Sequence, residues 1–190
     1  MSNTFYILSY ITGGILILLA LLNFIFPTRK STLIIKLVFD VVTVVNCVFI
    51  LHATNNTLIY ASIGTSVVGI SRDIIYSLRR KGKVFDNVFV PIAFAILFSC
   101  SLFITYRSWI SVLPVVGSVV SSITLYSYNQ KLTKIGAIVC ASLYITYNAI
   151  LLSSSDVLTI FALVSYVASF IGAAIGLFVL LLNNKTHKME

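Results

Sequence analysis

The sequence predicts an all-α integral membrane protein with seven transmembrane helices, and three observations support this fold class. The 190 residues are 59% hydrophobic and only 9% charged, with a mean hydropathy of +1.05. Seven apolar stretches follow one another, each close to the roughly 20 residues that cross the hydrocarbon of a bilayer. The basic residues fall almost entirely on alternate links between these stretches. An isolated segment in lipid must be helical, because only a helix satisfies its own backbone polar groups.

The positions of the basic residues also predict how the chain crosses the membrane. The seven predicted helices cover residues 5–26, 33–52, 58–78, 87–106, 108–127, 135–152 and 157–182. The basic residues of the odd-numbered links and of the tail are Arg29, Lys30, Arg79, Arg80, Lys81, Lys83, Lys131, Lys134, Lys185 and Lys188. Among the basic residues, only Arg107 lies in an even-numbered link. By the positive-inside rule, the N-terminus lies outside and the C-terminus in the cytoplasm, which requires an odd number of crossings.

The first two helices differ in their polar content. No Lys or Arg precedes the stretch 5–26 and no small-residue cleavage motif follows it, so we expect this helix to remain in the mature protein. The second helix contains Asp40, about 10 Å from its cytoplasmic start at a rise of 1.5 Å per residue. A charge near the centre of a membrane helix costs about 2.5 to 3.5 kcal/mol and needs a partner or water. Lys36 lies nearer the interface, where we expect its side chain to reach the headgroups.

The third helix supplies a partner for Asp40. Its polar and small residues recur at three- and four-residue steps and so share one face: Ser62, Thr65, Ser66, Gly69, Arg72, Asp73 and Tyr76. Because the second and third helices form a short hairpin, Arg72 should lie at the depth of Asp40 and pair with it. Asp73 would then face Arg79 and Arg80 or a water-filled cavity. This charge cluster of Asp40, Arg72 and Asp73 is either a gate or ion site, or a buried structural clamp.

An internal match predicts two repeated units. Residues 61–71 and 164–174 share Ser, Ser and Gly at the same spacing, and a closely similar offset aligns Asn46 with Asn148. We therefore predict two parallel three-helix units, residues 1–83 and 108–190, joined by a linker helix within 84–107. Parallel repeats with a site between them near mid-membrane are a known transporter plan. The alternative is chance, because small residues recur wherever membrane helices pack closely.

The repeat places a predicted substrate pathway between the two units. Asn46 and Asn148 would offer amide donors and acceptors near the middle of the second and sixth helices, and Pro114 begins a small and polar stripe in the fifth. The predicted pathway residues are Asn46, Asn148, Ser62, Ser66, Ser165, Ser169, Tyr144 and Pro114. Taken singly, each serine is better explained by helix packing, whereas for the two asparagines we favour the pathway role over interhelical hydrogen bonding.

Several short motifs resemble those of the YgjV-like bacterial inner-membrane proteins. They are the series Gly69, Arg72, Asp73, Tyr76 running into RRKGK, the series Pro114, Gly117, Ser118, and the pair Tyr147, Asn148. The resemblance implies a multi-pass protein of the bacterial inner membrane. It also implies a distant relation to carriers of sugars and vitamin precursors that are built as three helices, a linker helix and three more helices. It implies no particular ligand.

The remaining features exclude other classes. The chain has no HExxH, GxSxG or phosphate-binding glycine loop, and its three cysteines and two histidines are scattered, so we expect no enzyme, metal or cofactor. The basic residues lie in short loops at membrane boundaries, which favours lipid headgroups over nucleic acid as their partner. We predict a carrier of a small polar solute in the lipid bilayer. The alternative is a non-transporting membrane protein that binds a protein or lipid partner. Substrate, coupling ion, direction and homo-oligomeric state are not predicted.

Overall fold

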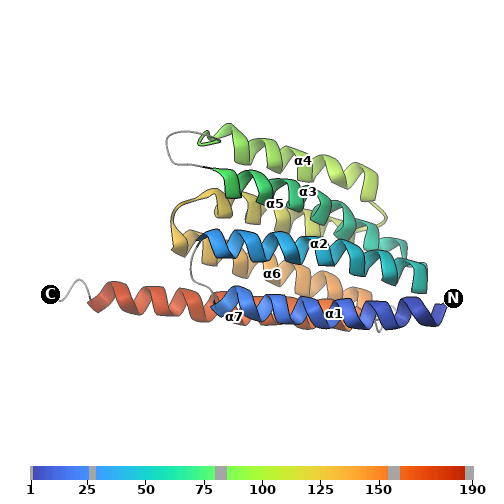
Figure 1. Cartoon of the computed structure of the whole chain (residues 1–190). Helices are drawn as coiled ribbons and strands as arrows, with labels where there is room; N and C mark the ends of the chain where they lie inside the picture. Colours follow the sequence, from blue (N-terminus) through green and yellow to red (C-terminus); the bar gives the residue numbers. More distant parts are fainter. Residues whose placement is uncertain (1, 26–28, 80–84, 154–158, 187–190) are drawn as a thin grey trace.

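A computed structural model describes residues 2–25, 29–79, 85–153 and 159–186, which form seven α-helices and two 3-10 turns. Figure 1 shows the helices running back and forth along one common direction, with the two termini at opposite ends of the bundle. The helices are α1 (Ser2–Ile25), α2 (Arg29–Thr54), α3 (Tyr60–Leu78), α4 (Phe89–Thr105), α5 (Val112–Tyr126), α6 (Gln130–Ser153) and α7 (Thr159–Thr186). The 3-10 turns Thr57–Ile59 and Trp109–Ser111 precede α3 and α5. The predicted all-α membrane fold is confirmed.

Six of the seven helices are long and apolar enough to cross a bilayer when α3 and α5 are counted with the 3-10 turns that precede them, and α4 falls just short. With 17 residues, α4 is about 26 Å long at 1.5 Å per residue. The helix ends differ from the predicted ones mainly at polar residues. Helix α6 begins at Gln130 rather than 135, because the Asn129 side chain caps it by accepting a hydrogen bond from the Lys131 amide at 3.0 Å.

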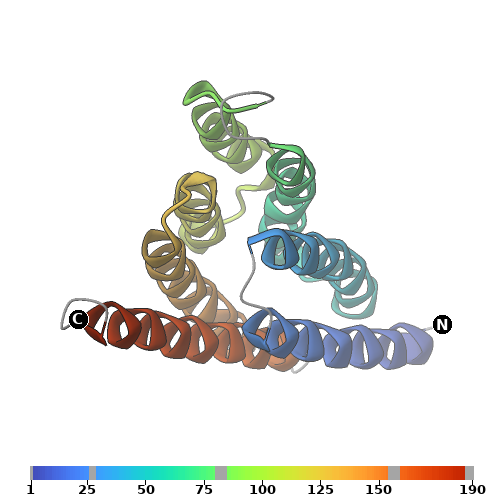
Figure 2. The ribbon, with the colours of Figure 1, turned by 60° about the vertical axis from the view of Figure 1, so that its left-hand side comes forward.

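The helices are arranged as a ring of six with one helix outside. Going round the ring, the neighbours are α1, α2, α3, α5, α6 and α7, and α7 closes the ring by packing on α1. Figure 2 shows this arrangement, with α4 outside and in contact with α3 and α5. Each predicted unit thus forms a consecutive half of the ring, α1–α3 or α5–α7. The two halves meet at two seams, α3 with α5 and α7 with α1, an order compatible with the predicted repeat.

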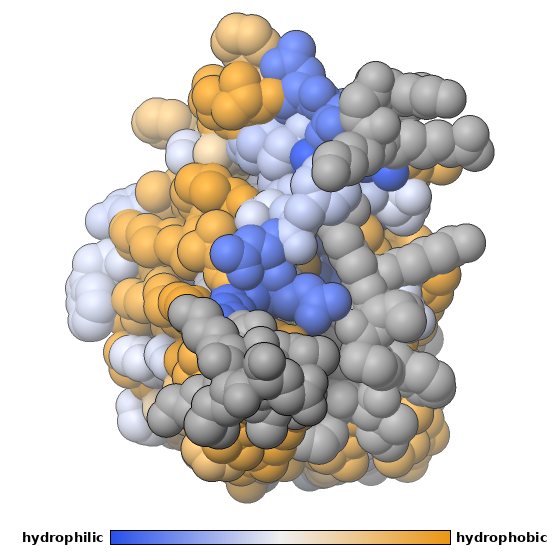
Figure 3. Space-filling model, turned by 90° about the vertical axis from the view of Figure 1, so that its left-hand side faces the viewer, coloured by the Kyte–Doolittle hydropathy of each residue, from blue (hydrophilic) through white to orange (hydrophobic). Residues whose placement is uncertain are grey.

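The two ends and the flanks of the bundle differ in polarity. Arg79 and Lys131 lie at the end where α1, α3, α5 and α7 finish, which we call the basic end, and Arg107 lies at the opposite end. Figure 3 looks onto the basic end and shows hydrophilic side chains gathered there, with apolar ones around them. Large apolar side chains also point outward along the flanks, such as Phe103 at 89% and Ile104 at 78% exposure on α4. Such a surface fits hydrocarbon rather than water.

Small residues set the distance between α5 and α6. A Cβ atom built on Gly136 would overlap the side chain of Thr124. Thr124 also accepts a hydrogen bond at its carbonyl oxygen from the Thr133 hydroxyl, at 3.1 Å. Close helix approach at glycine is the usual way in which membrane helices gain packing contacts.

We expect Gly136→Ala to lower the stability of the protein by about 1 to 3 kcal/mol, because the added methyl group overpacks the α5–α6 contact. The measurement is thermal unfolding of the purified full-length protein in detergent. Gly14→Ala is the matched control, since a Cβ there meets nothing within 4 Å. Adding Thr124→Gly to Gly136→Ala should restore part of the stability, because the overlap includes the Cβ atom of Thr124. Equal melting temperatures for the two glycine variants would contradict this packing.

Candidate functional site

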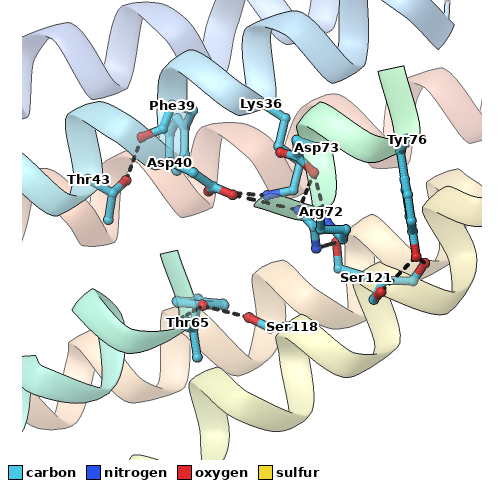
Figure 4. A network of polar contacts seen from close by, with 12 residues as sticks. Lys36, Phe39, Asp40, Thr43, Thr65, Arg72, Asp73, Tyr76, Ser118 and Ser121 are labelled. Atoms are coloured by element: carbon cyan, nitrogen blue, oxygen red, sulfur yellow. Dashed lines mark hydrogen bonds and ion pairs between the residues drawn. The ribbon is translucent and has the colours of Figure 1, made fainter. Parts of the chain in front are cut away.

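Four charged side chains meet inside the bundle, two from α2 and two from α3. Figure 4 shows Lys36 and Asp40 of α2 facing Arg72 of α3. Arg72 is bound most closely by its neighbour Asp73: Nε donates to Asp73 Oδ1 at 2.7 Å, and Nη2 lies 2.6 Å from the same oxygen. Asp40 is held less closely, with Oδ2 at 3.6 Å from Arg72 Nη2 and Oδ1 at 3.4 Å from Lys36 Nζ. Two cations and two carboxylates therefore share one site.

The predicted ion pair between Asp40 and Arg72 is confirmed, and two details of that prediction are wrong. Asp73 does not face Arg79 or a wet cavity, because it is fully buried and paired with Arg72. Arg79 pairs instead with Asp86 and lies over the ring of Tyr126. Arg80 lies outside the described residues. Lys36 turns toward Asp40 within the helix, where a partner charge outweighs reaching the headgroups.

Gly69 makes the approach of Asp40 to α3 possible. It lies one helical turn before Arg72, and a Cβ atom built on it would overlap the carboxylate of Asp40. Any other residue would displace the carboxylate of Asp40 from this position. The glycine therefore lets the carboxylate lie against the α3 backbone, within reach of the guanidinium.

Hydroxyl groups connect this cluster to the second half of the ring. The Tyr144 hydroxyl of α6 lies 2.9 Å from Thr65 Oγ1 on α3 and 3.0 Å from Ser118 Oγ on α5. Arg72 Nη1 approaches Ser121 Oγ at 3.5 Å, and the Tyr76 hydroxyl lies 2.9 Å from Ser122 Oγ. The polar stripe predicted for the third helix is buried over its whole length. It faces α5 and α6 rather than lipid.

A first cavity brings together four of the predicted pathway residues. Asn46, Ser62, Asn148 and Ser165 all line it, two from each predicted unit, and its volume is about 20 Å³. The two amides do not bind each other. Asn46 Oδ1 accepts a hydrogen bond from Thr12 at 2.7 Å, and Asn148 Nδ2 donates to the Tyr144 carbonyl at 2.7 Å. The volume is about that of one water molecule.

Two further cavities are lined by the remaining predicted pathway residues Ser66, Tyr144 and Ser169, but not by Pro114. The cavity beside the charges, about 30 Å³, is lined by Asp40, Arg72, Ser66 and Tyr144. A cavity of about 90 Å³ is lined by Ser169 and Lys36. Asp73 is buried behind Arg72 and does not line the cavity with Asp40. Pro114 is buried in the first turn of α5 and borders none of these three cavities.

Tyr166 was not among the predicted site residues, yet it borders all three cavities. Its ring stacks on Tyr144 with centroids 4.5 Å apart and meets Phe39 edge-on at 5.8 Å. The sequence does hold a signal for it, because Tyr166 lies three residues before Ser169 and so on the same face of α7. Tyr166 borders both the cavity of the two amides and the cavity of the charges, and its ring packs against Tyr144 and Phe39.

The amino-acid sequence can be compared with those of known protein families. The sequence profile of the Imp-YgjV family, described as bacterial inner membrane protein, matches residues 60–175, more than half of the chain. The chain belongs to the Imp-YgjV family. The match runs from the start of α3 into α7 and includes Arg72, Asp73 and Asn148, while Asp40 and Asn46 precede it. The protein is therefore a multi-pass protein of the bacterial inner membrane. No curated protein and no solved structure matches this Imp-YgjV chain.

Within residues 2–25, 29–79, 85–153 and 159–186, no group of three His, Cys, Asp or Glu side chains is placed to hold a metal ion. The groups that line the cavities are charged side chains, hydroxyls and amides.

The distances predict that the two ion pairs contribute differently to the stability of the protein. We expect Arg72→Gln to lower stability by about 3 to 5 kcal/mol, because it leaves the fully buried Asp73 without its cation. We expect Asp40→Asn to cost less, about 1 to 3 kcal/mol, since Arg72 keeps Asp73. Thermal unfolding in detergent measures both. The control is Arg107→Gln, an exposed charge whose removal should change little. A larger loss for Asp40→Asn would show that the pairs are ranked wrongly.

Proposed function

We propose that this Imp-YgjV protein is a carrier for a small polar solute and works by rocking of α1–α3 against α5–α7. One observation supports the proposal above all: Asn46 and Asn148, which the predicted repeat would make equivalent, line a single cavity between the two halves together with Ser62 and Ser165. A site between repeated units near mid-membrane is the arrangement of many carriers. Paired amides and hydroxyls suit an uncharged polar group of a solute.

The volume of this cavity implies a closed state. About 20 Å³ holds one water molecule and no organic solute. A solute would therefore enter only after the two halves move apart, and the aromatic side chains of Tyr166, Tyr144 and Phe39 would have to rearrange for it to pass further. Movement of this kind is what alternating access requires of a carrier.

The two seams of the ring differ in a way that fits rocking. The α3–α5 seam is bridged by the Tyr76 hydroxyl, which donates to the Ser122 carbonyl at 3.1 Å, and by Arg79, which donates to the Tyr126 carbonyl. At the α1–α7 seam, the Phe161 ring packs on Gly13 and meets Tyr10 edge-on at 5.3 Å. We propose that the polar α3–α5 seam, covered by α4, acts as the hinge and that the α1–α7 seam opens.

We propose no enzymatic activity. The buried carboxylates Asp40 and Asp73 are matched by the two cations Lys36 and Arg72, whereas a pair of catalytic aspartates must share a proton between them.

Asn46→Ala and Asn148→Ala should each reduce solute uptake at least about ten-fold, the effect of losing about 1.4 kcal/mol of binding. The assay is uptake into liposomes that contain the purified full-length protein, screened with sugars, nucleosides and vitamin precursors. Ser142→Ala is the matched control, since Ser142 lies on the exposed face of α6 and bonds only its own helix, at Ile138 O.

Uptake unaffected by either asparagine substitution would place the site elsewhere. Failure of the whole library, together with co-purification of a stoichiometric protein or lipid partner, would favour the alternative of a non-transporting membrane protein.

A further inference from the structure

We propose that the cavity of Asp40 and Arg72 takes up a small monocarboxylate together with one proton, the proton binding Asp40 and the carboxylate binding Arg72 and Lys36. This inference rests on the proposed carrier function. It makes the solute an anion, adds a coupling proton, and places the carboxylate in the cavity of the charges rather than in the cavity of the two amides. Two observations support it. Asp40 and Asp73 are paired with their cations to different degrees, and the charges in the site are balanced only while Asp40 is ionised.

The two carboxylates are held to very different degrees. Asp73 is fully buried and bound to Arg72 at 2.6 and 2.7 Å, so its charge is permanently matched. Asp40 touches its two cations only at 3.4 and 3.6 Å and lines a cavity. Arg72 Nη2 lies in ion-pair contact with both carboxylates yet makes no well-formed hydrogen bond, although it is buried. The carboxylate of a bound solute could accept from Arg72 Nη2 the hydrogen bond that Asp40 does not accept.

The charges of the site are balanced only while Asp40 is ionised. A proton on Asp40 leaves the two cations Lys36 and Arg72 facing the single carboxylate of Asp73. An unmatched charge inside a membrane costs about 2.5 to 3.5 kcal/mol. One monovalent anion removes that imbalance, so binding of the proton and binding of the anion favour each other. Neither a neutral solute nor a dianion restores the balance.

The groups around Asp40 are suited to a carboxylate. Lys36 faces Asp40 from its own helix, Arg72 and Asp73 from α3, Cys140 and Tyr144 from α6, and Tyr166 from α7. The hydroxyl donors of the same cavity are Thr65, Ser66, Ser118, Ser121 and Tyr144. Arginine binds carboxylates through two parallel hydrogen bonds, which adds geometric selectivity to the attraction of charge.

The size of the space limits the solute. The cavity beside the charges has about 30 Å³ and shares Lys36, Ser121, Cys140 and Tyr166 with the cavity of about 90 Å³. A carboxylate group would occupy the first and a body of a few atoms the second. In one cycle a proton from water on one side binds an oxygen of Asp40, the anion follows, and both leave on the other side. Each turnover carries no net charge.

The test uses full-length protein in liposomes with an inside-alkaline pH gradient and radiolabelled lactate, alanine and xylose as the three probes. We expect lactate to accumulate about ten-fold for each unit of pH gradient, the limit for one proton per anion, and a clamped membrane potential to make no difference. We expect Asp40→Asn to lose this gradient-driven accumulation and to retain exchange of lactate for lactate. Arg107→Gln, which removes an exposed charge at the opposite end of the bundle, is the control and should accumulate lactate normally.

A second measurement does not depend on a folded variant or on transport. Lactate should raise the melting temperature of the detergent-purified protein at pH 5 and not at pH 8, because only the protonated site has a free cation. Uptake of xylose or alanine that does not depend on the pH gradient would contradict the coupling proposal and would still support a carrier function. Stabilisation by lactate at low pH without any uptake would contradict the carrier function and would still support the anion-binding site. No stabilisation and no uptake overturns both.

Discussion

The burial of Arg72 is the constraint on which the inside of this protein depends. A guanidinium that is 1% exposed within a membrane bundle must find its counter-charges in the protein, because lipid offers none. Asp73 provides one counter-charge on the same helix and Asp40 another from α2. Gly69 supplies the room that lets Asp40 approach, and Ser121 and Phe98 cover the remaining faces of the guanidinium. The packing of α2 on α3, and of α3 on α5, is thus organised around one cation.

The same constraint explains the separation of the polar interior into two levels. Near the basic end, the charges and hydroxyls of α2, α3, α5 and α6 form one connected set. Toward the other end, Asn46 and Asn148 face a cavity without charges. Tyr166 and its aromatic neighbours lie between the two levels, and their rings fill the space that a solute would need. A closed, layered interior of this kind is compatible with a carrier between its open states.

The sequence predicted the parts of this arrangement that follow from depth and periodicity. The pairing of Asp40 with Arg72 follows from counting residues along a hairpin, and burial of the stripe from Ser62 to Tyr76 follows from its helical spacing. The direction of Asp73 does not follow, because helical spacing places Arg72 and Asp73 on one broad face and does not show that their side chains turn toward each other. Tyr166 was missed for a similar reason. Its spacing from Ser169 indicates which face of α7 it lies on, but not that its ring stacks on a tyrosine from another helix.

The position of α4 outside the ring has a consequence for how the surrounding lipid acts on the protein. At about 26 Å, α4 is shorter than the roughly 30 Å thickness of bilayer hydrocarbon. The acyl chains beside it must therefore compress, while those beside the 28-residue α7 need not. Since α4 rests on α3 and α5, this one-sided hydrophobic mismatch is felt at the boundary between the two halves. The chain length of the membrane's phospholipids thus becomes a mechanical variable for the protein.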